Sequence, residues 1–93
     1  MSKGIPKRAA KRDSNEGEIV AALRAVGAMV YRWSESGCPD LIVGWRDGRN
    51  YLLEVKRPGE KLTPAEAEFF ATWPGQKAVV HTIEEALQTI GAI

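Results

Sequence analysis

The chain has 93 residues, of which 44% are hydrophobic and 27% are charged, a composition typical of one small globular domain. Its single cysteine, Cys38, excludes an intramolecular disulfide and a multi-cysteine zinc site. No apolar run approaches the roughly 20 residues that span a bilayer, so we expect a cytoplasmic protein with no membrane partner.

Charge is segregated along the sequence, although the net charge is only +1. Five of the thirteen basic residues precede the first acid, Asp13, and the rest of the chain is net acidic. We therefore expect residues 1–14 to form a basic flexible arm and residues 15–93 to form the folded domain. Such an arm either reaches phosphates by long-range attraction or serves as a solubilising tail.

The first predicted elements are a helix and a strand. Ile19, Leu23 and Val26 recur at helical spacing, and Gly27 provides a C-terminal stop. The β-branched and aromatic residues of the stretch 28–33 predict a strand.

A β-hairpin is the clearest local prediction. Residues 40–45 and 51–57 are apolar runs, and the turn-forming residues 46–50 separate them. Pro58 and Gly59 then end the second strand of the hairpin.

The remainder of the chain predicts a helix, a strand and a final helix. Thr63, Pro64 and Glu66 supply the N-cap, the first-turn proline and the capping-box acid of a helix that ends near residue 73. Residues 77–81 predict a strand, and a capping box of Thr82 and Glu85 begins the last helix. The whole pattern predicts a single-domain α/β fold, in which helices flank a mixed β-sheet.

The second strand of the hairpin contains an unusual pair of charges. Alternation along the strand places Leu52, Glu54 and Lys56 on one face. Charges among apolar residues are costly to bury unless they pair or bind something, and an exposed ion pair is the alternative interpretation. Asp40 supplies a second carboxylate, at the start of the preceding strand.

The register of the hairpin decides whether the two carboxylates meet. With a two-residue turn, Asp40 would lie opposite Val55 and on the wrong face. With a three-residue loop of residues 46–48, in which Gly48 is left-handed, Asp40 lies opposite Glu54. We predict the second register.

Two adjacent carboxylates favour an oxygen-preferring divalent cation such as Mg²⁺ or Mn²⁺. The backbone carbonyl of Val55 is a candidate further ligand beside Asp40 and Glu54. Lys56 could orient or deprotonate the attacking water, or act as a point charge on a phosphate.

These residues resemble a known nuclease motif. Pro39-Asp40 and Glu54-Val55-Lys56, with thirteen residues between them, are similar to the PD-(D/E)xK signature. The longer runs 37–44 and 62–66 are similar to its VRR-NUC branch, over residues 15–90.

The resemblance implies a restriction-endonuclease-like core and a Mg²⁺- or Mn²⁺-dependent endodeoxyribonuclease that hydrolyses phosphodiester bonds. It also implies branched DNA as substrate (Holliday junctions or flaps), a homodimer and no organic cofactor. With no fused domain in sight, it further implies a stand-alone member of the kind that phages encode, working in the host cytoplasm. Charge and position, rather than the resemblance, suggest the DNA contacts, with solvated surface charges as the alternative: Lys7, Arg8, Lys11, Arg12, Arg57 and Lys61.

The family also places an acid on its first helix, as a catalytic residue and metal ligand. We favour Glu18 for this role and keep Glu16 in reserve. Because Asn15 and Glu18 have capping-box spacing, a purely structural role for Glu18 is the alternative. The family motif usually ends in Gln where this chain has Glu66, which we assign to helix capping alone.

Two other functions compete with hydrolysis. One is a nucleic-acid-binding module that keeps the fold without cutting, and the other is a protein-interaction domain with an exposed Glu54–Lys56 pair. We exclude His81 as a catalytic base. We expect Trp33, Trp45 and Trp73 to pack in the core or at a dimer contact, and an exposed one could instead stack on an unpaired base.

Overall fold

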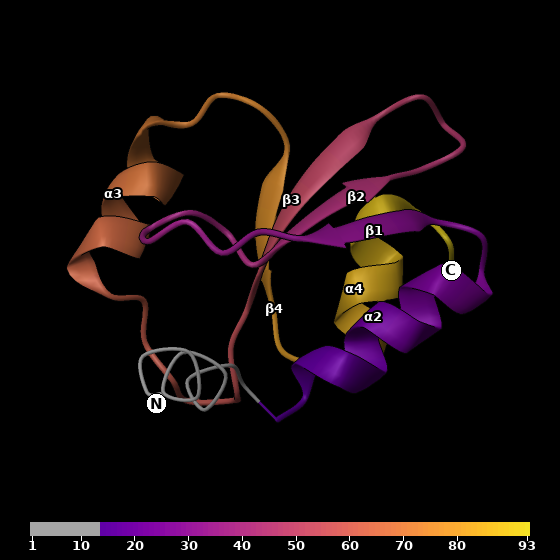
Figure 1. The fold of residues 1–93 in the computed structure, drawn as a ribbon, viewed down its shortest axis with the longest axis horizontal. Coiled ribbons are helices and arrows are strands. Elements are labelled where there is room, and N and C mark those ends of the chain that lie inside the picture. The colour runs from indigo at the N-terminus through magenta and orange to yellow at the C-terminus, as the bar shows by residue number, and fades with distance from the viewer. Residues whose placement is uncertain (1–13) are drawn as a thin grey trace, which may run out of the picture.

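A computed structural model describes residues 14–93 of the chain. The predicted contacts Lys7, Arg8, Lys11 and Arg12, like most of the predicted arm, lie outside these residues. The described elements follow the predicted order: α2 (Glu16–Ala25), β1 (Met29–Arg32), β2 (Leu41–Gly44), β3 (Asn50–Val55), α3 (Pro64–Thr72), β4 (Lys77–Val80) and α4 (Ile83–Ile90) (Figure 1). Within this part of the chain, no helix is long and apolar enough to cross a membrane.

The four strands form one mixed sheet in the order β1-β2-β3-β4. The first three strands pair antiparallel, and β3 pairs parallel with β4. A parallel neighbour requires a crossover connection, and α3 lies within that connection. The predicted α/β class, with helices flanking a mixed sheet, is confirmed.

One face of the sheet carries the hydrophobic core. Helices α2 and α4 lie side by side against this face (Figure 1). Alternate residues of β3 (Tyr51, Leu53 and Val55) point into the core and meet apolar side chains of both helices. The intervening residues of β3 therefore point to the opposite face, which α2 and α4 leave open.

Helix α3 lies apart from the other two helices, beyond the end of the sheet that faces away from the hairpin turn (Figure 1). Its residues are exposed or half-buried. The loop before β2 packs closely against α3: a Cβ on Gly37 would stand 3.1 Å from the Cβ of Ala65. Gly37 also has a positive φ of 81°, which favours glycine.

The hairpin adopts the second of the two registers. Leu41 lies opposite Leu53, and the Trp45 amide donates to the Arg49 carbonyl at 3.1 Å. Gly48 is left-handed, with φ of 84°, and closes the three-residue loop. The prediction of a loop over residues 46–48 is confirmed.

The capping boxes are confirmed in one case and half confirmed in another. Thr63 and Glu66 bond each other's backbone amides reciprocally, at 3.2 and 2.9 Å. The Thr82 hydroxyl accepts from the Glu85 amide, but the Glu85 carboxylate bonds the backbone and ring nitrogens of His81 instead of returning to Thr82. The prediction of a reciprocal box at Thr82 is therefore wrong in its second bond, because the Glu85 carboxylate is engaged by the amide and the ring of His81.

Candidate active site

Asp40 and Glu54 meet on the open face of the sheet. Continuing the β2–β3 register by one residue places them opposite each other. Leu52 and Lys56 direct their amides to the β4 side, so the backbone of Glu54, midway between them, also faces β4 rather than β2. Asp40 and Glu54 thus form a non-hydrogen-bonded antiparallel pair, the kind whose side chains approach most closely.

Asp40 is anchored to the strand that it faces. Its Oδ2 accepts a hydrogen bond from the Val55 amide at 2.8 Å. This bond replaces the ladder contact that β2, which begins at Leu41, no longer supplies. The amide and carbonyl of one strand residue point to the same side, so the Val55 carbonyl is directed toward Asp40.

Glu54 is a buried carboxyl with few hydrogen bonds to offset the cost of its burial. The residue is 2% exposed, and its Oε1 has no hydrogen-bond partner within the described part of the chain. Burial, followed by the nearby charges of Asp40 and Glu66, raises the pKa of Glu54 to about 9. Burial beside two other acids thus favours the protonated form of this carboxyl.

Lys56 is buried in a cage of carboxylates. Its Nζ lies 2.9 Å from Glu66 Oε1, 3.7 Å from Glu54 Oε2 and 4.0 Å from Glu60 Oε2. Burial alone would lower the pKa of Lys56, but the bond and charge of Glu66, with Glu54 and Glu60, raise it above its usual value. Because Glu54 and Lys56 are both buried, they do not form the exposed ion pair of the alternative interpretation.

Glu66 belongs to this cluster, which the sequence did not reveal. Its Oε1 accepts a hydrogen bond from the Thr63 amide at 2.9 Å and lies 2.9 Å from the Lys56 ammonium. Burial would raise the pKa of Glu66, but these bonds hold it below its usual range. The family-like run of residues 62–66 could have pointed to Glu66 as part of the site. Its role in the capping box was already a sufficient explanation for an acid at that position.

The two acids on α2 occupy different environments. Glu16 is 2% exposed and its Oε2 bonds Arg32 Nε at 2.8 Å, whereas Glu18 is exposed. Asn15 makes no side-chain cap, so the proposed Asn15–Glu18 capping box is wrong. The Asn15 amide instead donates to the carbonyls of Lys56 and His81, at 3.3 and 2.8 Å. The structure therefore favours Glu16 over Glu18 as the helix acid that faces the sheet.

The remaining predicted contacts lie at the surface. Arg57 and Lys61 are both exposed, and the Arg57 amide and guanidinium are close to Glu60. His81 is held by Glu85 at 2.9 Å, as a locally hydrogen-bonded histidine.

The donor set suits a hard divalent cation. Within residues 14–93, no group of three or more His, Cys, Asp or Glu side chains is arranged to hold a metal. Magnesium, however, commonly uses one or two carboxylates together with water and phosphate oxygens. Asp40, Glu54 with its unpartnered oxygen, and the Val55 carbonyl fit that requirement.

An acid at the start of one strand and a Glu-x-Lys sequence in the next, on a mixed sheet flanked by helices, define a domain of the PD-(D/E)xK class. Residues 8–83 match the family described as the VRR-NUC domain. This chain belongs to the VRR-NUC family.

Two similar proteins agree with this assignment. "Putative nuclease p44" of Acyrthosiphon pisum secondary endosymbiont phage 1 is 35% identical over 60 residues, which cover 61% of this chain and 64% of that protein. The chain thus matches less than two thirds of this relative's length. A solved structure described as a VRR_NUC domain is 26% identical, with a TM-score of 0.63 over 84% of this chain and 96% of the other.

Proposed function

We propose that this protein is a divalent-metal-dependent DNA endonuclease, in which Asp40, Glu54 and the Val55 carbonyl hold Mg²⁺ or Mn²⁺. The observation that carries the proposal is the adjacent pair of carboxylates with an unpartnered, buried Glu54 oxygen. A cation bound there would lower the pKa of a water molecule and stabilise the negative charge that develops during phosphodiester hydrolysis.

Lys56 acts in this proposal as a fixed cation rather than as a base. Its raised pKa keeps the ammonium charged at neutral pH. Glu66 and Glu54 hold the ammonium beside the carboxylate pair, where it can bind a phosphate oxygen and orient the attacking water. Glu66 is then a positioning residue that acts through Lys56.

The proposed substrate is DNA, and specifically branched DNA such as a Holliday junction or a flap. The relative in an endosymbiont phage is named as a nuclease, which supports the class of reaction. The exposed cations Arg57 and Lys61, together with Lys7, Arg8, Lys11 and Arg12, are the proposed phosphate contacts. For the helix acid of the site, the buried Glu16 becomes the first candidate, and the exposed Glu18 is kept as the alternative.

Cleavage assays test this function directly. Labelled duplex, flap and four-way-junction DNA are incubated with Mg²⁺, with Mn²⁺ or with chelator, and Asp40→Asn and Lys56→Ala serve as site variants. We expect metal-dependent cutting that both variants lose. Cutting that persists in both variants would place the activity elsewhere, and binding without any cutting would favour the non-hydrolytic nucleic-acid-binding module.

We also propose that the protein acts as a two-fold homodimer, because two symmetric sites suit paired cuts across a junction. Sedimentation at the concentration used for cleavage is expected to give the mass of two chains. A single-chain mass with full junction cleavage would contradict this part of the proposal.

A further inference from the structure

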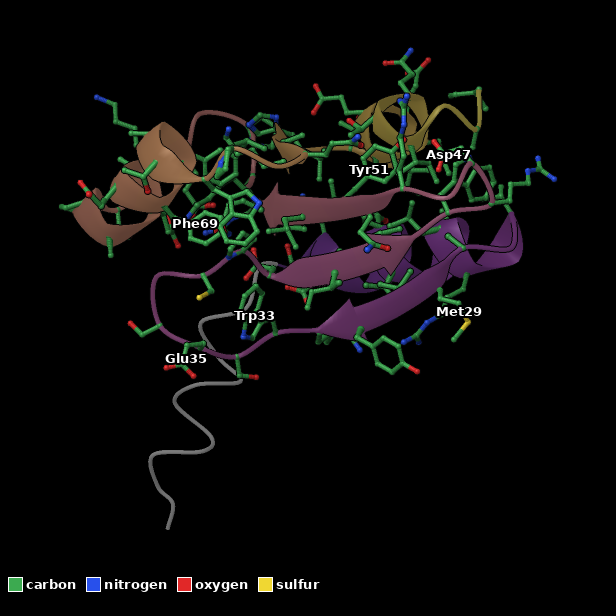
Figure 2. All side chains as sticks on the ribbon, turned by 90° about the horizontal axis from the view of Figure 1, so that it is seen from above. Met29, Trp33, Glu35, Asp47, Tyr51 and Phe69 are labelled. Carbon is green, nitrogen blue, oxygen red and sulfur yellow. The ribbon has the colours of Figure 1, made fainter. Side chains whose placement is uncertain are left out.

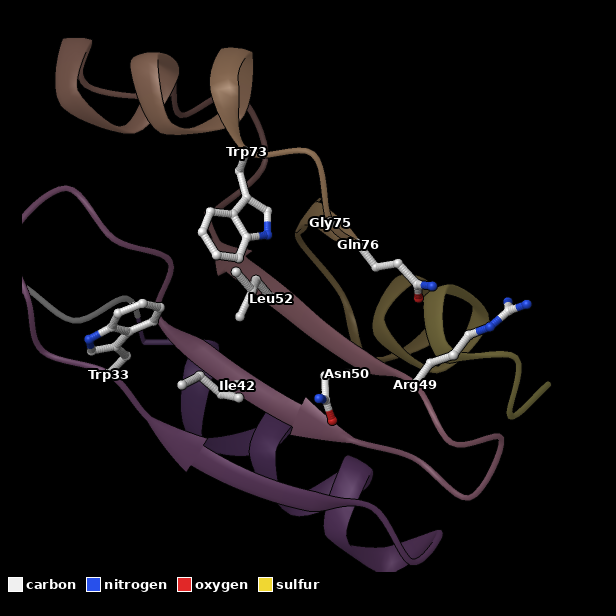
Figure 3. A pocket seen from close by; sticks show the side chains of 8 residues that line it. All are labelled: Trp33, Ile42, Arg49, Asn50, Leu52, Trp73, Gly75 and Gln76. Carbon is white, nitrogen blue, oxygen red and sulfur yellow. The ribbon is translucent and has the colours of Figure 1, made fainter.

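A pocket of about 510 Å³ lies on the open face of the sheet (Figure 3). Its apolar walls are Trp33, Ile42, Leu52 and Trp73, and the side-chain amides of Asn50 and Gln76 lie at its margin. The volume falls within the roughly 300–1,000 Å³ of small-molecule sites. Trp33 is half-buried, Trp73 is 42% exposed, and both line this pocket. Core packing is therefore wrong for these two tryptophans, which leaves the dimer contact and base stacking as the alternatives.

The pocket adjoins the carboxylate pair. Ile42 and Leu52 lie opposite each other on β2 and β3. The next pair on the same face is Asp40 and Glu54, two residues further and thus roughly 7 Å along the strands. A phosphodiester at the carboxylates therefore places a neighbouring nucleotide within reach of the pocket.

The partly exposed ring of Trp73 is fixed by its neighbours. One side of its indole stacks on Phe69, with ring centroids 5.2 Å apart and an interplanar angle of 15°. Gly75 allows the ring to lie close to the backbone, because a Cβ there would stand 2.8 Å from Trp73 Nε1. Figure 2 shows Phe69 and Trp33 at the same end of the sheet, opposite the Asp47 turn. A fixed, partly exposed ring loses little conformational entropy when another ring stacks on it.

The polar groups of the pocket suit the edge of a nucleobase. Asn50 and Gln76 are exposed, and each amide offers both donors and acceptors. Arg49 is among the lining residues, although its side chain extends away from Trp33 and Trp73 (Figure 3), and the lining from the described part of the chain contains no acid. A nucleobase has π-faces that suit the tryptophan rings, and it has donors and acceptors at its edge that suit the side-chain amides.

We propose that this pocket binds an unstacked nucleobase of the nucleic acid whose phosphate lies at Asp40 and Glu54. The inference rests on the proposed function, and it assigns Trp33 and Trp73 as base-stacking residues. It gives the site a preference for DNA with unpaired bases next to the cut, because a base held in a duplex stack cannot enter the pocket without unpairing.

Binding of short oligonucleotides in chelator tests the pocket without cleavage. The probes are an oligothymidylate and an oligomer of the same length whose bases are replaced by abasic residues, followed by anisotropy and by quenching of tryptophan fluorescence. Base stacking predicts that the wild-type protein binds the oligothymidylate roughly 5- to 150-fold more tightly than the abasic oligomer. Equal affinity for both probes would overturn the proposal.

Variants assign the effect to the pocket. Trp73→Ala and Gly75→Ala are expected to reduce the preference for bases several-fold, and Trp73→Phe to keep most of it. Tyr31→Ala is the matched control, because Tyr31 is an aromatic residue, 63% exposed, outside the lining. Circular dichroism verifies that each variant is folded.

Three further outcomes distinguish a base-binding pocket from a dimer contact and from the nuclease site beside it. If Trp73→Ala dissociates a dimer of the DNA-free protein, a second copy of the chain occupies the pocket and the proposal fails. If the wild-type protein cleaves DNA but has no preference for bases, the pocket proposal fails while the nuclease proposal stands. A preference for bases without any cleavage supports the pocket and defeats the hydrolytic function.

Discussion

Replacing Glu54 with glutamine should make the metal-free domain more stable while it abolishes cleavage. The pKa of Glu54 is about 9 in the folded protein, against an ordinary value of 4.5. Above pH 4.5 the unfolded chain releases a proton that the folded domain retains. The contribution of Glu54 to stability is therefore lost progressively as the pH rises from 4.5 to about 9.

The expected size of the effect follows from this difference. At pH 7, about 2.5 pH units above the ordinary pKa, the loss amounts to about 3 kcal/mol. Glutamine keeps the size of the side chain and does not ionise, so Glu54→Gln avoids this loss. In a domain of this length, about 3 kcal/mol corresponds to roughly 12–24 °C in Tm.

Thermal unfolding in chelator, from pH 4 to pH 8, measures the difference between the two proteins. We expect it to be near zero at pH 4 and to grow with pH. Glu84→Gln, on an exposed position of α4, is the matched control and should change little. Added Mg²⁺ should stabilise the wild-type protein selectively. A gain that does not vary with pH, or no gain at pH 7, would refute the reasoning about Glu54.

Five further substitutions test other parts of the site and of the fold. Lys56→Ala should lower the rate of cleavage by at least about 100-fold, measured in single-turnover assays, because a fixed cation next to the reacting phosphate is lost. Glu66→Gln should shift the pH profile of Mg²⁺ binding to lower pH, because the charge and hydrogen bond of Glu66 both raise the pKa of Glu54; an unchanged profile would argue against this coupling. Gly48→Ala should cost about 1–2 kcal/mol in denaturant unfolding, because φ is positive there, and a neutral result would contradict the left-handed turn. Glu16→Ala should destabilise the domain by about 1–3 kcal/mol through loss of the bond to Arg32, whereas Glu18→Ala should leave stability within about 0.5 kcal/mol.

The local features of the fold could be predicted from the sequence. The hairpin register depends on two signals that lie close together: a left-handed Gly48 and the alternation along residues 51–56. The helix at Pro64 depends on a capping box within four residues. Both predictions succeeded because the interactions that decide them are short in range.

The choice between the two acids of α2 could also have been made from the pattern. Glu16, Ile19, Val20 and Leu23 are the buried residues of this helix, at the spacing of one helical face. Glu16 therefore lies on the buried face of the helix. Glu18, two residues further along, points away from that face. Similarity to a family motif had outweighed this periodicity.

The contact between Glu66 and Lys56 could not be predicted in the same way. It requires α3 to return to the end of β3, and nothing local to either residue specifies that position. The exposure of Trp73 was missed for a related reason. Large aromatic residues usually signal a core, and only the tertiary arrangement shows that α2 and α4 cover the other face of the sheet.

The turn at residues 46–48 governs a site far from itself. It lies five residue pairs from Asp40 and Glu54, roughly 17 Å along the strands. Paired residues share a face, so the closing pair of the turn, Trp45 with Arg49, keeps Asp40 opposite Glu54. A turn that instead paired Arg46 with Arg49 would move Asp40 opposite Val55 and turn it to the core side. The geometry of the carboxylates thus depends on which residues close the turn, so relatives can lengthen the loop while they keep that pair, and a shifted pair would need a β-bulge to bring the two acids back to one face.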